Sequence, residues 1–235
     1  SYPSETISIV KLDKVEQVSI ENGMVRWNEV LKALEYKVLI ENDENQYSFN
    51  TGIYNSFDLA SEIAGIKGGD YNLFVIAVSN ETSGINSNKS EAVAITKLFA
   101  PTNLRVENNA LVWDEVENAS KYTLVVDNGD EQLVEKSFTL PSDSRAGAYV
   151  IKMKAYGDGV RYFDSDLTSE QDAFEAIKLQ APESITNSNN IINSNAIENA
   201  SAYRYFDYAD EQNVLLFAEE DVESLGDSSS MHSAK

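Results

Sequence analysis

The stretch "WDEVENASKY" at residues 113–122 decides the fold, because it repeats "WNEVLKALEY" at residues 27–36. Both copies keep a tryptophan and a tyrosine nine residues apart, with a valine and an alanine at the same places between them. The two copies lie 86 residues apart along the chain. Self-similarity at this spacing predicts tandem copies of one structural unit, each the size of a small domain.

Two further recurring phrases mark where each unit ends and the next begins. The phrase that closes a unit is led by Ser-Glu and alternates apolar with other residues, which is typical of a strand. It reads "SETISIVKL" at 4–12, "SEAVAITKL" at 90–98 and "SEQDAFEAIKL" at 169–179. The phrase that opens the next unit reads "KLDKVEQV" at 11–18, "KLFAPTNL" at 97–104 and "KLQAPESI" at 178–185.

These boundaries predict five segments. Residues 1–11 are the last strand of a preceding repeat, 12–98 and 99–179 are complete repeats, 180–218 are a partial degenerate repeat, and 219–235 are a tail. We expect the tail to be flexible, because it is acidic and rich in serine. The earlier part of the preceding repeat would then lie outside this sequence.

Apolar residues within a unit alternate with a period of two, which predicts strands that each bury one face. The alternating runs include "MVRW", "YKVLI", "YNLFVIAV" and "YVIKMKAY", and turn-forming runs such as "NDEN", "KGGD" and "DNGDE" separate them. About seven short strands in a unit of this length are typical of a two-sheet sandwich. The predicted fold class is therefore all-β, with tandem sandwiches and an incomplete third repeat.

The order of these motifs resembles the fibronectin type III repeat, a relative of the Ig-like sandwiches. The motifs are A-P-x-x-L, L-x-W, Y-x-L-x-V, S-F-x-L, a G-x-Y strand and a Ser-Glu strand, although the first unit lacks the A-P pair. The resemblance implies a tryptophan on the second strand, a tyrosine on the third and another tyrosine opening the sixth. By position these core residues are Trp27, Tyr36, Tyr71, Trp113, Tyr122 and Tyr149.

The spacing between tryptophan and tyrosine also predicts a corner. Trp113 and Tyr122 are an odd number of residues apart, so on one straight strand they would face opposite sides. Both can point into the core only if the chain turns between them, in the run "DEVENAS". A buried ring of this size is a large apolar contribution in a domain without disulfides.

The third unit departs from the pattern. Its "ENASAYRYFDYADEQ" echoes the "ENASKYTLVVDNGDEQ" of the second unit, but Ser194 takes the place of Trp113 and no later strand of the G-x-Y type follows. Half a sandwich leaves an edge and an apolar face uncovered. Either the remaining strands lie outside this sequence, which we favour, or this half docks on the second unit or on a partner chain.

Composition excludes several classes of partner and chemistry. The chain has 39 acidic and 18 basic residues, a net charge of −21, and no cysteine. Nucleic acids and anionic lipid surfaces would repel such a chain, and the absence of cysteine excludes disulfides and thiolate catalysis. No apolar run is long enough to insert into a membrane, and no basic-then-apolar signal opens the sequence.

We expect no catalytic residues. The only histidine, His232, lies in the predicted tail and cannot form part of a rigid nucleophilic group. The glycines of "GIKGGD" at 65–70 precede a strand, so they indicate a turn rather than a phosphate-binding loop. The chain is therefore predicted not to be an enzyme and to need no organic cofactor.

A calcium ion is the one cofactor that the sequence leaves open. Carboxylates crowd the turn "YGDGVRYFDSD" at 156–166, where Asp158, Asp164 and Asp166 are the candidate ligands, and Ca²⁺ prefers several such oxygens. The run does not match an EF-hand loop. The alternative, which we favour, is that these residues supply turn geometry.

The same turn is the candidate ligand-binding loop, because loops at the ends of sandwiches commonly carry contacts. It contains Tyr156, Arg161, Tyr162 and Phe163, whereas the matching "VSNETSGINSN" of the first unit has no aromatic residue. An exposed tyrosine could stack on a sugar while the arginine binds its polar edge. Alternatively, the rings lie along the hairpin and pack on the neighbouring unit.

Three functions fit these observations. The leading one is a non-catalytic spacer or adhesion segment of an extracellular or cell-surface multi-repeat protein, of bacterial origin, a location that only the family resemblance implies. The second is a module that recognises a glycan or a protein through the 156–163 loop. The third is an accessory region of a secreted polysaccharide-degrading enzyme. Expected partners are neighbouring domains of a longer chain and surface glycans or proteins, not nucleic acid or membrane.

Overall fold

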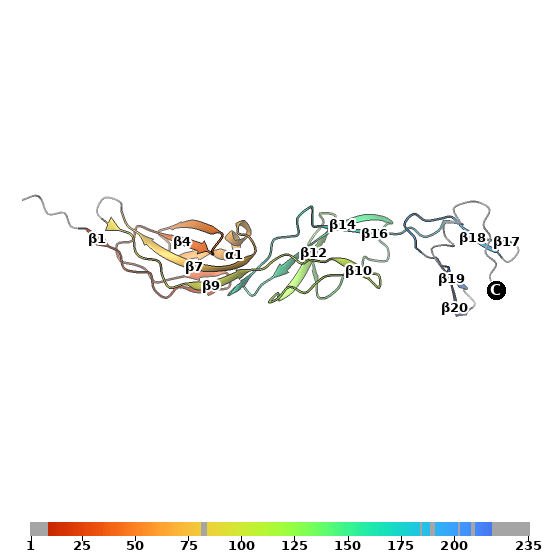
Figure 1. Ribbon diagram of the computed structural model, residues 1–235, viewed down its shortest axis with the longest axis horizontal. Coiled ribbons are helices and arrows are strands. Elements are labelled where there is room, and N and C mark those ends of the chain that lie inside the picture. The colour runs from red at the N-terminus through yellow and green to blue at the C-terminus, as the bar shows by residue number, and fades with distance from the viewer. Residues whose placement is uncertain are drawn as a thin grey trace, which may run out of the picture. The chain divides into compact units, whose positions relative to one another are not determined.

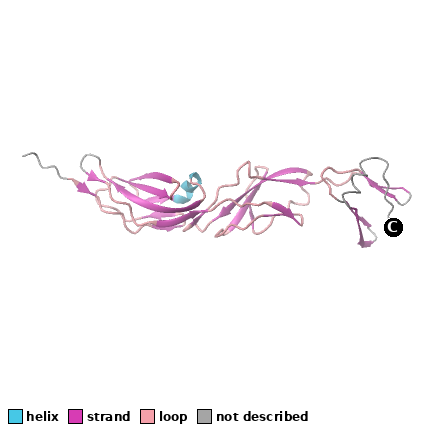
Figure 2. Cartoon of the chain, viewed as in Figure 1, coloured by secondary structure: helices cyan, strands magenta, loops and turns pink. Residues whose placement is uncertain are grey.

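The computed structural model describes residues 9–80, 84–183, 185–188, 191–201, 203–207 and 210–217. Nearly all regular structure in these residues is β-strand (Figure 2). The exceptions there are the four-residue helix α1 (Leu59–Glu62) and the 3₁₀ turn η1 (Ile63–Gly65). The chain divides into two compact units, Ser1–Thr139 with Val150–Phe174 and Leu140–Tyr149 with Glu175–Lys235.

The first sandwich consists of two antiparallel sheets that face each other across one apolar core. The smaller sheet has the order β2 (Ser19–Glu21), β3 (Met24–Arg26), β6 (Ser56–Asp58). The larger sheet has the order β5 (Gln46–Gly52), β4 (Glu35–Glu41), β7 (Gly69–Val78), β9 (Val93–Lys97). Beyond β9 lies one more strand, β15 (Tyr162–Phe163), which comes from the second sandwich. Figure 1 shows β4, β7 and β9 side by side.

The second sandwich repeats this strand order with a reduced smaller sheet. Its larger sheet runs β13 (Gln132–Val134), β12 (Lys121–Val126), β14 (Gly147–Tyr156), β16 (Phe174–Lys178). Its smaller sheet pairs β10 (Arg105–Glu107) with β11 (Ala110–Val112), and only an isolated bridge from Leu111 to Phe138 stands where the first sandwich has β6. The prediction of all-β tandem sandwiches is confirmed.

The remaining described strands form three separate two-stranded pairs. β1 (Val10–Lys11) lies parallel to β8 (Gly84–Ile85) in the loop that follows β7. Two hairpins occupy the third repeat, β17 (Ile185–Ser188) with β18 (Ile191–Ser194), and β19 (Tyr203–Asp207) with β20 (Asp210–Phe217). How much of a third sandwich they form stays a prediction, and the predicted tail with His232 lies outside the described residues.

The predicted tryptophan–tyrosine pairs form the centre of each sandwich. The rings of Trp27 and Tyr36 meet edge to face, with centroids 5.4 Å apart and planes at 64°, and those of Trp113 and Tyr122 repeat this at 5.5 Å and 64°. All four residues are buried. Each tryptophan directly follows the second strand of its sandwich and each tyrosine lies on the third. Edge-to-face contact brings the positive ring edge to the negative ring face, which stabilises the pair beyond its apolar burial.

The corner between the two rings takes the same form in both sandwiches. The N–H of Val116 donates to the Tyr122 hydroxyl at 2.8 Å, and Asn118 adopts a left-handed φ of 63°. The first sandwich has the equivalent bond from Val30 to Tyr36, also 2.8 Å. In the third repeat Asn199 has a φ of 64°, so the left-handed backbone turn recurs although the tryptophan does not.

The sixth strand shows the predicted alternation and one difference between the repeats. On β7 every second residue from Tyr71 to Ala77 is buried. The Tyr71 hydroxyl donates to the Lys67 carbonyl at 2.9 Å, and the Tyr149 hydroxyl donates to the Arg145 carbonyl at 2.6 Å. Such a tyrosine corner is typical of this sandwich class. Unlike the other five predicted core aromatics, Tyr149 is only half-buried.

The shorter edge strand of the second sandwich explains the exposure of Tyr149. In the first sandwich Tyr47 of β5, opposite Ile40 in the sheet, packs edge to face on Tyr71 at 6.0 Å. In the second sandwich the pairing between β12 and β13 stops at Leu124 opposite Gln132, before the position equivalent to Tyr47 is reached.

Replacing Trp113 with alanine should destabilise the second sandwich by about 3–5 kcal/mol, because a large buried ring is lost and a cavity remains. Urea unfolding followed by circular dichroism measures this change. Tyr54→Ala is the matched control, because that ring is exposed and its loss should cost less than about 0.5 kcal/mol. A Trp113→Ala midpoint equal to that of the control would contradict the core assignment.

Ionisation of Tyr71 should weaken the first sandwich at high pH. Burial raises the pKa of Tyr71 to about 12, and the neighbouring Tyr47 hydroxyl acts in the same direction. Because the folded pKa exceeds the unfolded value of about 10, the associated stability is present below pH 10 and is lost as pH rises toward 12. A difference titration at 295 nm between the parent and Tyr71→Phe measures it. A difference curve centred near pH 10 would contradict the burial of this hydroxyl.

Candidate functional site

The hairpin of the second sandwich between β14 and Thr168 reaches the sheet of the first sandwich. Its strand β15 pairs in parallel with β9, so that Tyr162 lies opposite Thr96 and Phe163 lies opposite Lys97. The Thr96 N–H donates to the Arg161 carbonyl at 2.8 Å, and the Leu98 N–H donates to the Phe163 carbonyl at 2.9 Å. This pairing covers an edge strand that would otherwise leave its hydrogen-bonding groups open. We call this contact the joint.

Phe163 is the apolar anchor of the joint. Its side chain is 2% exposed and belongs to the core of the first sandwich, together with Ile66, Tyr71 and Ile95. A residue of the second repeat thus completes the core of the first. Burying a phenylalanine side chain contributes roughly 1.5–3 kcal/mol relative to leaving it exposed.

Lys97 is the polar anchor. Its side chain is 1% exposed, and its ammonium group donates to the Asp166 carboxylate at 2.7 Å, to the Ala64 carbonyl at 3.4 Å and to the Ile66 carbonyl. An ammonium has three N–H donors, and all three find acceptors here. Such complete pairing is needed for a buried charge, because an unpaired one carries a large desolvation cost.

Asp158 shapes the tip of the hairpin. Its carboxylate accepts the N–H groups of Val160, Arg161 and Tyr162 at 2.8, 2.9 and 2.9 Å. Burial alone would raise the pKa of Asp158, but these backbone donors outweigh it and hold that pKa below its usual value. The hairpin is therefore ordered by its own backbone bonds to this carboxylate.

Two glycines allow close approach within the hairpin and at its tip. A Cβ on Gly157 would lie 2.0 Å from the Tyr162 carbonyl oxygen, so no other residue fits there without separating the two arms. Gly159 has a φ of 69°, and its carbonyl accepts the N–H of Gly23 of the first sandwich at 2.6 Å. The tip thus contacts the β2–β3 turn as well as β9.

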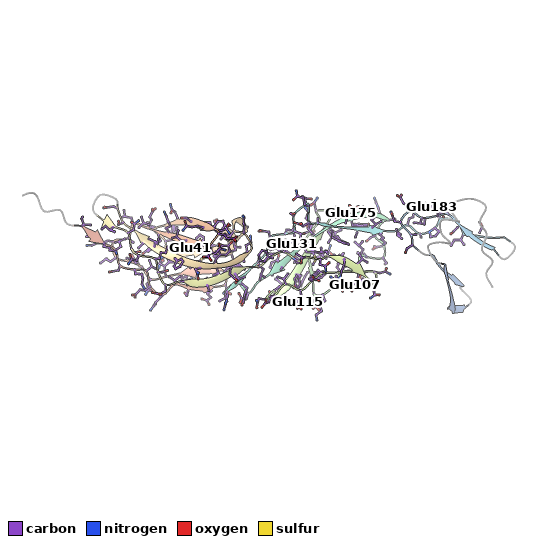
Figure 3. All side chains as sticks on the ribbon, viewed as in Figure 1. Glu41, Glu107, Glu115, Glu131, Glu175 and Glu183 are labelled. Atoms are coloured by element: carbon purple, nitrogen blue, oxygen red, sulfur yellow. The ribbon has the colours of Figure 1, made fainter. Side chains whose placement is uncertain are left out.

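The three predicted calcium ligands have separate partners. Asp158 accepts backbone N–H groups, Asp164 contacts the Lys154 ammonium at 3.2 Å, and Asp166 contacts Lys97. Each carboxylate therefore already has a donor, and a calcium site at these residues stays a prediction. In the part of the chain that the structure describes, no three His, Cys, Asp or Glu side chains are grouped so that they could hold a metal. Of the glutamates labelled in Figure 3, Glu41, Glu107 and Glu175 lie on strands β4, β10 and β16, and the others lie between strands.

The four predicted ligand-binding residues differ in exposure. Phe163 is buried in the joint, and Tyr156 is half-buried with the ammonium groups of Lys121 and Lys154 over its ring, 4.7 and 4.6 Å from the centroid. Burial and the hydrogen bond to Glu131 raise the pKa of Tyr156. The remaining two are accessible: Arg161 is exposed and lies 5.6 Å from the centroid of the partly exposed Tyr162 ring. A ligand role for these two stays a prediction.

Two hollows are formed by residues of the two sandwiches. One, of about 580 Å³, lies beside the ring pair of the second sandwich and is bounded by Leu133 and Lys136. The other, of about 400 Å³, is lined by the connection around Phe99 and by Leu167. Among the residues that line them, neither hollow has a histidine or a buried group of carboxylates.

Sequence reasoning missed Lys97, and it predicted Asp166 as a calcium ligand rather than as the partner of a lysine. The recurring "KL" indicates a unit boundary, but its sequence does not show that Lys97 is buried, which is a rare environment for lysine. Its partner Asp166 lies in the next repeat, and only the folded joint brings the two together. No described helix has the length and apolar character needed to span a bilayer.

No protein-family model matches the sequence, and no curated protein matches it. Among solved structures, the chain is similar to the FN1–FN3 domains of chicken CNTN1, with 13% identity, coverage of 89% of this chain and 85% of that chain, and a TM-score of 0.29. It is also similar to a two-domain fibronectin type III segment of chicken tenascin, with 13% identity, coverage of 72% and 98%, and a TM-score of 0.28. The strand order and the repeated ring pairs show a fold of tandem β-sandwiches, the architecture to which the fibronectin type III repeat belongs.

Replacing Phe163 with alanine should destabilise the first sandwich, although the residue belongs to the second repeat. The expected loss is about 3–5 kcal/mol, because a buried aromatic side chain is removed from a packed core. The chain has two tryptophans, so in a Trp113→Phe background the fluorescence of Trp27 reports on the first sandwich alone.

Val160→Ala is the matched control, because that side chain lies on the same hairpin but is half exposed. Its urea midpoint, followed through Trp27, should stay within error of the background protein. A Phe163→Ala variant with the same Trp27 midpoint as this control would contradict the shared core.

Proposed function

We propose that this chain is a non-catalytic spacer or adhesion segment of an extracellular multi-repeat protein, in which each sandwich is fixed to its neighbour. The observation that carries the proposal is the joint: Phe163 of one repeat lies in the core of the repeat before it. A segment that sets a distance between other domains needs neighbours that do not rotate freely. Most interfaces between domains of one chain are small and permit such motion.

Three kinds of contact support a fixed joint. Strand pairing between β9 and β15 sets the register, Phe163 prevents withdrawal of the hairpin, and the Lys97–Asp166 pair adds a directional polar contact. The Gly23–Gly159 hydrogen bond adds a further contact at the hairpin tip. Rotation about a single bond in the connection would break several of them at once.

The net charge of −21 and the lack of grouped metal-binding side chains among the described residues support a role in spacing or adhesion. An acidic surface keeps such a protein soluble and away from nucleic acids and anionic lipids. Placement at a bacterial cell surface or in secreted material is part of this proposal and follows from the type of repeat.

A second candidate is recognition of a glycan or a protein through the hairpin. The specific observation in its favour is the Arg161–Tyr162 pair, which presents a ring face and a guanidinium outside the joint. Aromatic faces stack on sugars, and guanidinium groups bind carboxylates in a bidentate manner. Immobilised glycans bound by the parent and not by Tyr162→Ala would favour this candidate over a pure spacer.

Double electron–electron resonance tests the spacer proposal directly. The chain has no cysteine, so Leu31→Cys and Leu133→Cys, both at exposed positions, place one spin label on each sandwich without competing thiols. A fixed joint should give a single narrow distance distribution, and Phe163→Ala should broaden it. A distribution in the parent as broad as in Phe163→Ala would overturn the proposal.

A further inference from the structure

The joint has a second copy, at the other end of the first sandwich. There β1 pairs in parallel with β8, with Val10 opposite Gly84 and Lys11 opposite Ile85. The Leu12 N–H donates to the Ile85 carbonyl at 3.0 Å, as the Leu98 N–H donates to the Phe163 carbonyl at 2.9 Å. In one case β8, from the loop after β7, lies parallel to β1, which ends at Lys11. In the other case β15, from the loop after β14, lies parallel to β9, which ends at Lys97.

Hydroxyl contacts establish which residues correspond. Ser87 accepts the Ala77 N–H at 2.9 Å, and 78 residues later Ser165 accepts the Ala155 N–H at 2.9 Å. Ile85 stands two residues before Ser87, and Phe163 stands two residues before Ser165. The same spacing aligns Ser90, which accepts from Val75 at 3.0 Å, with Thr168, which accepts from Met153 at 3.0 Å. Ile85 is therefore the first repeat's equivalent of Phe163.

The polar anchor also has its equivalent. The Lys11 ammonium donates to the Asn88 side-chain oxygen at 3.1 Å, as the Lys97 ammonium donates to Asp166 at 2.7 Å. Lys11 precedes Lys97 by 86 residues and Asn88 precedes Asp166 by 78, so the pair occupies matching places in the two contacts. Strand pairing, apolar anchor and lysine are thus all present twice.

The two copies differ in what covers them. Phe163 is 2% exposed, whereas Ile85 is 51% exposed. Lys97 is buried and donates to carbonyls of the first sandwich, whereas Lys11 is exposed. Ile9 and Val10 are exposed on the same strand segment. The contact at β1 therefore has every part of the joint except a core into which its apolar anchor can insert.

We propose that β1, β8 and the side chains of Lys11 and Ile85 form the docking surface for another sandwich of this same type. The residues that end at Lys11 would be the last strand of that sandwich, as β9 is of the first. Ile85 would insert into its core as Phe163 does, and Lys11 would be buried against its backbone carbonyls. The inference rests on the proposed function as part of a repeat array. The partner is taken to be another such sandwich because the equivalent contact, the joint, already connects the first and second sandwiches.

A chimera that keeps the full chain tests this surface. A copy of residues 13–89 is placed directly before Ser4, so that "SETISIVKL" takes the place of "SEAVAITKL" as the last strand of the added module. Ile85→Cys in the original copy then reports on burial, because the chain has no other thiol. Labelling by a thiol reagent should slow by about a hundredfold in the chimera relative to the unmodified chain carrying the same substitution.

Ile53→Cys, at a site far more exposed than Ile85, is the matched control and should react at the same rate in both proteins. With Trp27 and Trp113 of the original chain replaced by phenylalanine, the fluorescence of the added copy of Trp27 shows whether the new module is folded. An Ile85→Cys rate that does not change overturns the inference. So does an added module that stays unfolded, because the same residues fold against Phe163 in the unmodified chain. Spin-label distances across β9 and β15 do not involve this surface, so the two proposals can fail separately.

Discussion

Burial of a few large rings is the constraint on which the sandwiches depend. With no cysteine in the chain, no disulfide can hold the two sheets of a sandwich together. The edge-to-face pairs of Trp27 with Tyr36 and of Trp113 with Tyr122 fill the space between the sheets. The tyrosine hydroxyls accept the N–H groups of the corner, so that burial leaves this polar group of each pair satisfied. Apolar packing and hydrogen bonding are thus combined in the same two residues.

Apolar burial and satisfied hydrogen bonds also stabilise the joint between the two repeats. A phenylalanine is buried with its strand paired and a lysine is buried with three acceptors, so neither group is left without partners. A hairpin that only touched the neighbouring sheet would leave the edge of β9 open to other strands. Because the hairpin pairs with β9 and its ring enters the core, removal of one contact weakens the others.

Repetition and alternation made most of the fold predictable from sequence. The recurring tryptophan and tyrosine, their corner and the alternating strands depend on local spacing, and the structure places them as expected. The partial exposure of Tyr149 could not be predicted in the same way. It depends on the length of β13, which is shorter than β5 although the surrounding motif is similar. A family pattern gives the position of a ring but not the neighbour that covers it.

The hairpin residues show the same limit for the candidate site. Sequence identified the cluster of aromatic and acidic residues at 156–166, but not the direction that each one faces. Phe163 and its neighbour Tyr162 lie on opposite faces of a two-residue strand, so one is buried in another repeat and the other is partly exposed. The partner of Lys97 likewise lies 69 residues away, at a separation that no local pattern indicates.

Sharing a core residue between repeats also affects how the chain is made. Domains generally fold in order as a chain leaves the ribosome, but the first sandwich includes a ring that is translated only near the end of the second. While the polypeptide is still growing, the first sandwich lacks Phe163 and one side of β9 is uncovered. The core of the first sandwich is therefore completed only after Phe163 of the following repeat has been synthesised.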